Sequence, residues 1–196
     1  MPDRPGPSIY RQVAELHASA IDQGFLSQLG PRFLELLYEA IDASDSSVLL
    51  VETRNGRLCG FASGGTGIGP VYRRLLRRLP ALIAALWPVM FSPRKLRRIA
   101  ELLRHSRQPC PAGLPQAELY SIAVAPAFRG SGVAERLYTA LRQAFAEREV
   151  AAFRIVVGDS LAPARAFYLR MGAVPRTTVQ VHQGAASTVF VDEHPR

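Results

Sequence analysis

Residues 123–141, AVAPAFRGSGVAERLYTAL, contain the pattern that decides the fold. An apolar run ends at Val124, two closely spaced glycines follow, and apolar residues then recur at helical spacing from Val133. A strand that turns through glycines into a helix exposes backbone N–H groups at the positive end of the helix dipole. Glycines also let a phosphate group approach the backbone closely. The stretch therefore predicts an anion-binding loop between a strand and a helix.

This loop lacks the two commonest phosphate-binding patterns. No Lys-Ser/Thr pair follows Gly132, as a Walker loop requires, and the dinucleotide spacing G-x-G-x-x-G is missing. A glycine loop alone is a weak signal, so its meaning depends on the elements around it.

Outward from the loop, the sequence predicts alternating helices and strands. The hairpin is the clearest element, because Asn55-Gly56 separates two apolar runs. The predicted elements are helices at 8–42 with a break at Gly30-Pro31, strands at 47–53 and 58–64, a strand at 117–124, a helix at 133–149, a strand at 151–157, a helix at 161–171, and strands at 177–183 and 187–192. This order predicts one mixed α/β domain over residues 1–196.

Composition narrows the class of protein. The chain has 196 residues, of which 48% are hydrophobic and 20% charged, the balance of a globular domain. Two cysteines cannot build a disulfide framework, and we expect both to be buried or loop thiols rather than nucleophiles. The polar start and the short apolar run at 79–91, well under the roughly 20 residues of a membrane span, favour a cytoplasmic protein.

Positive charge is concentrated in residues 71–108. This segment contains ten lysines and arginines and one acid, Glu101, so its own formal charge is +9. The whole chain has a net charge of +8, so the other residues together contribute about −1. Its apolar spacing predicts two helices, at about 71–87 and 92–106, split by Pro88 and by Ser92-Pro93. The segment is interpreted as a solvated cover, a lid over an acceptor site, a membrane-surface element or a clamp for an anionic substrate. A nucleic-acid surface is not expected, because aromatic residues do not alternate with the arginines.

Two motifs resemble those of the GNAT superfamily of N-acetyltransferases. Residues 129–134, RGSGVA, fit the acetyl-CoA signature R/Q-x-x-G-x-G/A. Residues 162–172, APARAFYLRMG, resemble the second motif N-x-x-A-x-x-x-Y-x-x-x-G-F, with Ala164, Tyr168 and Gly172 on matching positions. Leu161 and Ala173 replace the motif's asparagine and phenylalanine. The resemblance implies an α/β (α+β) GNAT-like fold, a mixed and mainly antiparallel sheet flanked by helices, with the basic helical insertion between the third and fourth strands.

The resemblance also implies roles for particular residues. The tyrosine of the second motif, Tyr168, would be the general acid, and Glu118, on the strand that enters the loop, would be a base acting through water. With Leu161 in place of the motif's asparagine, one CoA contact would be lost or would pass to Asp159 or Ser160. The implied cofactor-binding residues are Ile122, Ala123, Val124, Arg129, Gly130, Ser131, Gly132, Val133, Ala134, Ser160 and Ala164. The co-substrate would be acetyl-CoA, and no metal is expected.

Each of these side chains also has a structural interpretation. Tyr168 is the kind of residue that fills a core, and Glu118 at a strand start is often solvated. The alternation Glu118, Tyr120, Ile122 predicts one shared face of the strand. The four histidines have no partner pattern, so we expect them at the surface.

The sequence thus predicts an N-acetyltransferase in which an amine attacks acetyl-CoA directly. The arginine-rich segment favours a small anionic acceptor, such as a nucleotide-linked amino sugar. Because segment 71–108 would lie near the point where acceptors enter a GNAT-like fold, we favour its interpretation as a lid. A protein or peptide amine, or a CoA-binding or membrane-surface module without turnover, remains the alternative. We expect a monomer or homodimer, with possible contact between 71–108 and an anionic membrane.

Overall fold

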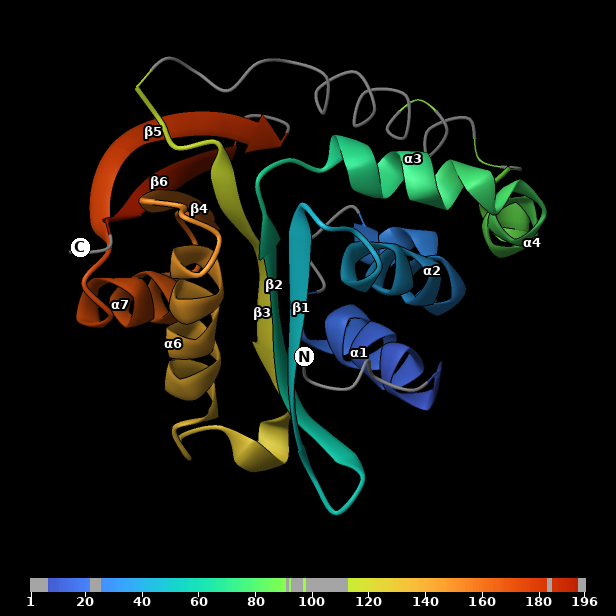
Figure 1. Cartoon of the computed structure of the whole chain (residues 1–196), viewed down its shortest axis with the longest axis horizontal. Coiled ribbons are helices and arrows are strands. Elements are labelled where there is room, and N and C mark those ends of the chain that lie inside the picture. Colours follow the sequence, from blue (N-terminus) through green and yellow to red (C-terminus); the bar gives the residue numbers. More distant parts are fainter. Residues whose placement is uncertain are drawn as a thin grey trace.

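The computed structural model describes residues 7–21, 26–90, 92, 97, 113–182 and 185–193. A six-stranded sheet separates two groups of helices, α1 to α4 on one side and α6 and α7 on the other (Figure 1). The strands are β1 (Ser47–Arg54), β2 (Arg57–Gly65), β3 (Ala117–Val124), β4 (Ala152–Gly158), β5 (Val174–His182) and β6 (Ala185–Glu193). Their order in the sheet is β1-β2-β3-β4-β6-β5, and only β3 and β4 run parallel. The mixed, mainly antiparallel sheet predicted from the sequence is confirmed.

The hairpin between β1 and β2 forms at the predicted turn. Asn55 and Gly56 both have positive φ, 51° and 73°. A two-residue turn with positive φ at both positions matches the twist of the flanking strands. The register Arg54↔Arg57 closes the hairpin directly around these two residues.

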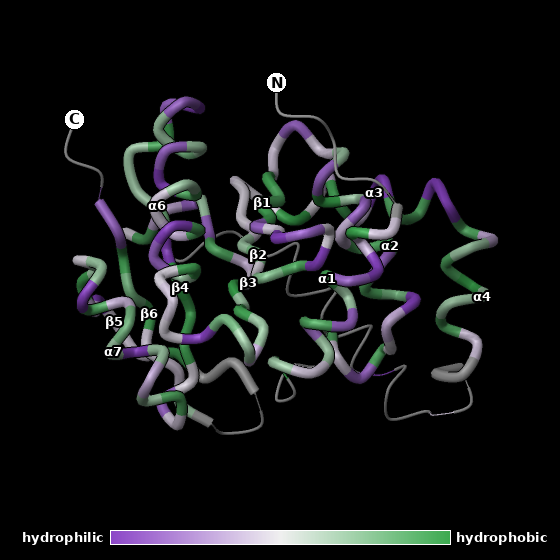
Figure 2. The backbone as a smooth tube through the Cα atoms, turned by 90° about the horizontal axis from the view of Figure 1, so that it is seen from below, coloured by the Kyte–Doolittle hydropathy of each residue, from purple (hydrophilic) through white to green (hydrophobic). Residues whose placement is uncertain are grey.

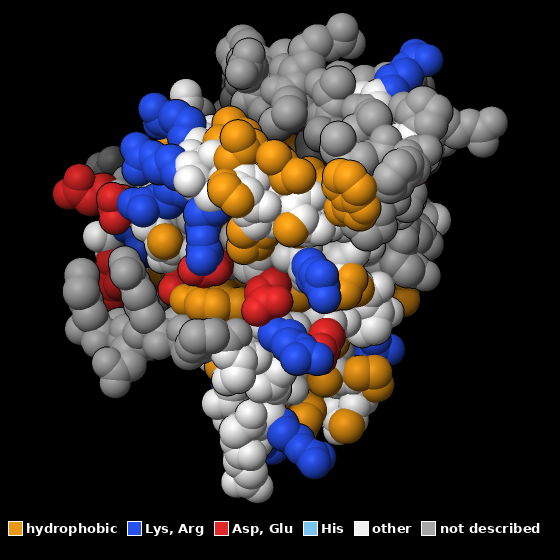
Figure 3. Space-filling view, turned by 90° about the vertical axis from the view of Figure 1, so that its right-hand side faces the viewer, with side chains coloured by type: hydrophobic (Ala, Val, Ile, Leu, Met, Phe, Trp, Pro, Cys, Tyr) orange, Lys and Arg blue, Asp and Glu red, His pale blue; other side chains and the backbone are white. Residues whose placement is uncertain are grey.

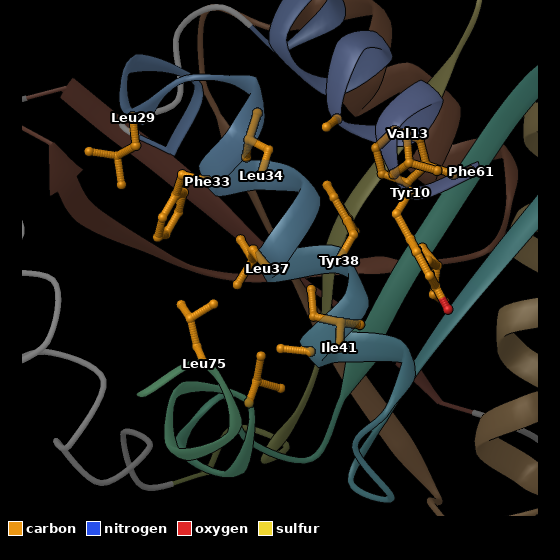
Figure 4. Close-up of a cluster of buried hydrophobic side chains, with 14 of the residues drawn as sticks. Tyr10, Val13, Leu29, Phe33, Leu34, Leu37, Tyr38, Ile41, Phe61 and Leu75 are labelled. Atoms are coloured by element: carbon orange, nitrogen blue, oxygen red, sulfur yellow. The ribbon is translucent and has the colours of Figure 1, made fainter. Parts of the chain in front are cut away.

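One core lies between the sheet and the helices α1 (Pro7–Ala20) and α2 (Pro31–Asp42), with the 3-10 turn η1 (Leu26–Leu29) between the two helices. Figure 4 shows Val13 and Tyr10 of α1 beside Phe61 of β2, with apolar side chains spread along α2. Val13, Leu34, Tyr38 and Phe61 are almost fully buried there. Burying each such side chain stabilises the fold by about 1.5–3 kcal/mol.

The second core lies under α6 (Val133–Ala146) and α7 (Ala162–Arg170). Two glycines of β2 let α6 pack closely against the sheet. A Cβ on Gly60 would meet Val133 Cγ1 at 2.9 Å, and one on Gly64 would meet Phe145 Cζ at 2.9 Å. A larger residue at either position would push α6 outward, because backbone lies equally close on the other side.

The basic segment differs from its prediction in two ways. It follows the second strand of this chain, not the third, because the described residues before Ser47 are helical. Its first helix is broken into α3 (Gly69–Arg77) and α4 (Leu79–Met90) at Arg78, and α4 continues past Pro88. Pro80 explains the break, since proline lacks the N–H that a continuing helix needs but is accepted in a first turn. The second predicted helix, 92–106, lies almost entirely outside the described residues.

His17 is not at the surface as predicted. It is 2% exposed, and its Nδ1 is hydrogen-bonded with the Tyr38 hydroxyl. Its ring also stacks on Phe61 at 6.4 Å between centroids. Burial lowers the pKa of His17 to about 4, so the imidazole is neutral at pH 7.

Candidate active site

β3 and β4 pair over only three residues and then separate. The parallel register joins residues 117–119 to 153–155. Beyond it, β3 pairs only with β2 on its other side, and β4 only with β6. The carboxyl ends of two parallel strands therefore diverge at the point where β3 leads into the glycine loop, and facing backbone groups remain available for a ligand.

The loop reaches α6 through a 3-10 turn, η2 (Pro126–Phe128), and two left-handed glycines. Gly130 has φ +73° and Gly132 has φ +78°, a backbone conformation that other residues adopt at a cost. Ser131 Oγ donates to the Phe128 carbonyl at 2.6 Å, which holds the turn in place. No side chain caps the first residue of α6.

Because of this loop conformation, several backbone amides have no hydrogen-bond acceptor among the described residues. Within the part of the chain that the structure describes, the backbone N–H groups of Gly130, Gly132, Val133 and Ala134 have no acceptor. Unsatisfied amides at the positive end of a 14-residue helix attract phosphate groups. The predicted anion loop therefore has the geometry to bind one, and these residues fit the pyrophosphate of a CoA ester.

Arg136 ties the loop to the sheet, a role that the sequence did not indicate. Its Nη1 donates to the Ser131 carbonyl at 3.1 Å, while Nη2 and Nε donate to Glu52 of β1 at 2.6 and 3.1 Å. These bonds hold the pKa of Glu52 below its usual value. Glu52 and Arg136 are 84 residues apart, so no local pattern could have revealed the pair.

Arg129 and Arg54 add positive charge beside the loop. Arg129 Nε lies 3.5 Å from the Val124 carbonyl, and the Arg54 guanidinium stands 5.8 Å from the centre of the Phe128 ring. Both side chains are exposed. This surface suits an anionic ligand.

A β-bulge changes the alternation along β3. Ser121 pairs with Ser63 and Leu119 with Gly64, so Tyr120 has no partner on β2. Ile122 consequently packs on the α6 side, while Tyr120 packs on the side of α1 to α3. The expected shared face of Glu118, Tyr120 and Ile122 is therefore wrong, because the extra residue reverses the alternation.

Ile122 and Val124 pack towards Val133 and Leu137 at the start of α6, and Ala123 points into the opposite core. The strand thus places two of the three predicted residues on the side that carries the loop.

Glu118 lies in a polar cluster on the α3 side of the sheet. Its Oε2 accepts from Arg154 Nη2 at 2.6 Å and from Nε at 3.0 Å, and Arg154 Nη1 donates to the Pro115 carbonyl. Burial, with a contribution from the Glu118 charge, raises the pKa of Tyr72 and of Tyr120 to about 12. Both phenols are therefore protonated and neutral at pH 7, and the Tyr120 hydroxyl accepts a hydrogen bond from the Gly67 amide at 3.3 Å.

Tyr168 lies on the other side of the sheet, on α7. Its ring packs against Tyr138 at 6.0 Å, Phe167 at 5.3 Å and Phe190 at 6.2 Å between centroids. Burial raises the pKa of Tyr168 well above its ordinary value, so the residue carries its proton at pH 7. The structure does not bring Tyr168 and Glu118 into contact, and the two belong to opposite faces.

The substitutions in the second motif affect the start of α7. Leu161 precedes the helix without capping it through its side chain. Asp159 accepts from Thr188 Oγ1 at 2.6 Å, so this carboxylate supports β6, while Ser160 is exposed in the turn and Ala164 packs beside Tyr168 in the second core. Of the two candidate replacements for asparagine, Ser160 is the more exposed to solvent.

The fold and the free amides of this loop fit a protein that binds a phosphate-bearing ligand beyond the end of β3. The family model described as "Acetyltransferase (GNAT) family" matches residues 14–173. The chain belongs to this family, and it is an N-acetyltransferase that uses acetyl-CoA, the co-substrate typical of the family.

Solved structures share the fold at low identity. A ribosomal-protein-alanine N-acetyltransferase from Brucella melitensis has a TM-score of 0.63 at 17% identity, covering 98% of both chains. An N-acetyltransferase from Staphylococcus aureus Mu50 gives 0.63 at 12%, covering 96% of this chain and 94% of that one. The PaiA N-acetyltransferase from Thermoplasma acidophilum, in complex with coenzyme A, gives 0.57 at 9%, covering 98% and 97%. No curated protein matches the sequence significantly.

Proposed function

We propose that this enzyme transfers the acetyl group of acetyl-CoA directly to a primary amine of a small anionic acceptor. The observation that carries the proposal is the set of free amides at Gly130, Gly132, Val133 and Ala134, at the point where β3 and β4 diverge. These amides would hold the pyrophosphate, and Ile122 to Val124 would lie along the pantetheine arm. The diverging strands leave β3 backbone groups free to donate to the thioester carbonyl, where negative charge develops.

Tyr168 would serve as the general acid. Its phenol carries its proton at pH 7, as a proton donor to a leaving thiolate must, although burial raises its pKa and makes it a weaker acid. The α7 helix begins shortly after β4, and Tyr168 packs in the second core, on the face of the sheet opposite Glu118. Acid and base would therefore approach the acyl group from opposite faces of the sheet.

Glu118 would serve as the base for the amine proton. The Arg154 guanidinium stabilises its charged form, which weakens it as a direct base. Transfer through a water molecule, as the sequence suggested, fits this arrangement because the carboxylate can remain paired with Arg154. Tyr72 and Tyr120, which surround Glu118 on the α3 side, would orient the acceptor amine or that water.

The long-range electrostatic field of this positively charged protein favours an anionic acceptor. The net charge is +8, and the segment 71–108 alone contributes +9. Such a field raises the rate of encounter with anions more than it strengthens their contacts. A nucleotide-linked amino sugar combines a primary amine with phosphate charge, so it is the acceptor we propose.

The test is release of the CoA thiol in the presence of an amine panel. The panel pairs a nucleotide-linked amino sugar with the free amino sugar, and adds an aminoglycoside and an unmodified peptide. We expect the nucleotide-linked amine to have the highest kcat/KM and to lose that advantage at high salt. Intact mass spectrometry after incubation with acetyl-CoA alone should show unacetylated protein, because direct attack forms no acyl-enzyme.

Two results would change this proposal. Preference for the peptide would make the protein a peptide amine acetyltransferase. Coenzyme A binding without thiol release for any amine would leave a CoA-binding module, for which the loss of the motif asparagine at Leu161 would be the reason.

A further inference from the structure

An apolar surface with unpaired arginines lies on α3 and α4, away from the place where β3 and β4 separate. Leu76, Leu79, Ile83 and Trp87 are 55%, 50%, 46% and 59% exposed, and we call these four residues the α3–α4 patch. They make up half of the large hydrophobic side chains exposed among the described residues. Leu79, Ile83 and Trp87 follow one another at i, i+4 and i+8, so they form one stripe along α4. Figure 3 shows the corresponding face, with apolar side chains gathered together and cationic side chains along one edge.

The patch is not needed to cover the core. Leu82 and Ala85 of α4, together with Val71 and Leu75 of α3, already face the first core and are buried. Figures 1 and 2 place α4 at the end of the molecule opposite α7, so its outer stripe projects from the body of the protein. An exposed apolar stripe at such an extremity is a contact surface rather than a packing surface.

The charges beside the patch are positive and partly unsatisfied. Arg78 forms an ion pair with Glu39, and Arg74 lies 3.9 Å from Asp45. Arg73 and Arg77 are exposed and form no ion pair within the described part of the chain. They lie on α3 opposite Val71 and Leu75, and so point outward. Glu39 and Asp45 thus each face an arginine, and the charges of Arg73 and Arg77 accompany the apolar stripe.

We propose that the α3–α4 patch docks the enzyme on the surface of an anionic lipid bilayer. Leucine, isoleucine and tryptophan would enter the boundary between headgroups and acyl chains, while arginines would meet the lipid phosphates. No helix among the described residues is long and apolar enough to cross a bilayer, so the contact is peripheral.

Charge complementarity selects this occupant over a second copy of the chain. A two-fold interface through the patch would place Arg73 and Arg77 of one copy near those of the other, since such an interface joins the same surface to itself. Glu39 and Asp45, which face this part of α3, already lie against Arg78 and Arg74. A bilayer offers apolar depth and negative charge together, which matches both halves of the surface.

The chain contains its own probe for this contact, because Trp87 is its single tryptophan. Fluorescence would be recorded with vesicles of phosphatidylcholine alone and with equal parts of phosphatidylcholine and phosphatidylglycerol. We expect a blue shift, and quenching by brominated acyl chains, only with the anionic vesicles, and loss of both at high salt. Arg73→Gln with Arg77→Gln should weaken partitioning about twenty-five-fold, because each arginine near an anionic surface contributes about a fivefold factor. Leu76→Ser with Ile83→Ser should weaken it at least as much.

Matched controls separate the patch from general charge and hydrophobicity. Arg32→Gln with Arg57→Gln removes two exposed cations elsewhere, and Leu169→Ser with Val174→Ser removes two apolar side chains of similar exposure. Both controls should partition like the wild type. The proposal is overturned if the wild type ignores anionic vesicles, if the controls lose as much as the patch variants, or if sedimentation shows that the patch holds a dimer instead. The assay uses neither acetyl-CoA nor an acceptor, so its failure would leave the proposed acetyl transfer untouched.

Discussion

Gly130→Glu tests whether the glycine loop holds the pyrophosphate. A Cβ at Gly130 meets nothing within 4 Å, so there is space for a side chain to leave the backbone at this position. Two costs remain: the strain of a non-glycine residue at φ +73°, and a carboxylate beside the free amides. Strain lowers the free energy of unfolding by about 1–2 kcal/mol and does not by itself weaken ligand binding.

The electrostatic cost can be estimated for a carboxylate about 4 Å from the phosphate charges. Two unit charges 4 Å apart repel by about 1 kcal/mol even in the dielectric of bulk water, and by about 4 kcal/mol near a protein surface. Taking the lower value for each of two phosphate charges gives about 2 kcal/mol, or roughly thirtyfold weaker binding of CoA. Isothermal titration calorimetry with CoA at low salt would measure this loss.

Gly56→Glu is the matched control. Gly56 has the same φ of +73° and the same open surroundings, but it lies in the hairpin turn between β1 and β2. The control variant should share the loss of stability in chemical denaturation and keep wild-type affinity for CoA. Equal affinity in both variants would refute the assignment of the loop, because the variants share the strain and the added carboxylate and differ only in where that carboxylate lies.

Three further predictions concern single side chains. Tyr168→Phe keeps the ring and its packing against Tyr138, so the variant should fold normally while kcat falls by roughly 10²–10⁴; wild-type turnover would make Tyr168 a packing residue only. Glu118→Gln should lower kcat/KM by a similar factor of roughly 10²–10⁴ near neutral pH, and the loss should shrink at alkaline pH where the amine is already deprotonated; a loss of equal size at every pH would argue for positioning through Arg154 instead. The third prediction concerns stability. In the unfolded chain His17 binds a proton near pH 6.5, whereas in the folded chain it binds one only near pH 4. The free energy of unfolding should therefore fall by up to about 3 kcal/mol as the pH drops from about 6.5 to about 4. His17→Gln should flatten that part of the pH profile in denaturant titrations, and an unchanged profile would contradict the buried neutral imidazole.

The sequence by itself determined the elements and the loop. The strand at 117–124 and the hairpin turn at Asn55-Gly56 follow from patterns of neighbouring residues, and so do the glycines before α6. Such patterns can be read without the fold, because backbone conformation at a turn and apolar periodicity depend on residues only a few positions apart.

Tertiary structure decided how those elements meet. The bulge at Tyr120 and the divergence of β3 from β4 depend on register between strands, which neighbouring residues in the sequence do not specify. The Arg136–Glu52 pair that steadies the loop joins segments 84 residues apart. The fold also buries His17, because Tyr38 and Phe61 from other elements surround it. Pairing and burial between distant segments arise only when the whole chain packs, and here they place Glu118 and Tyr168 on opposite faces of one sheet.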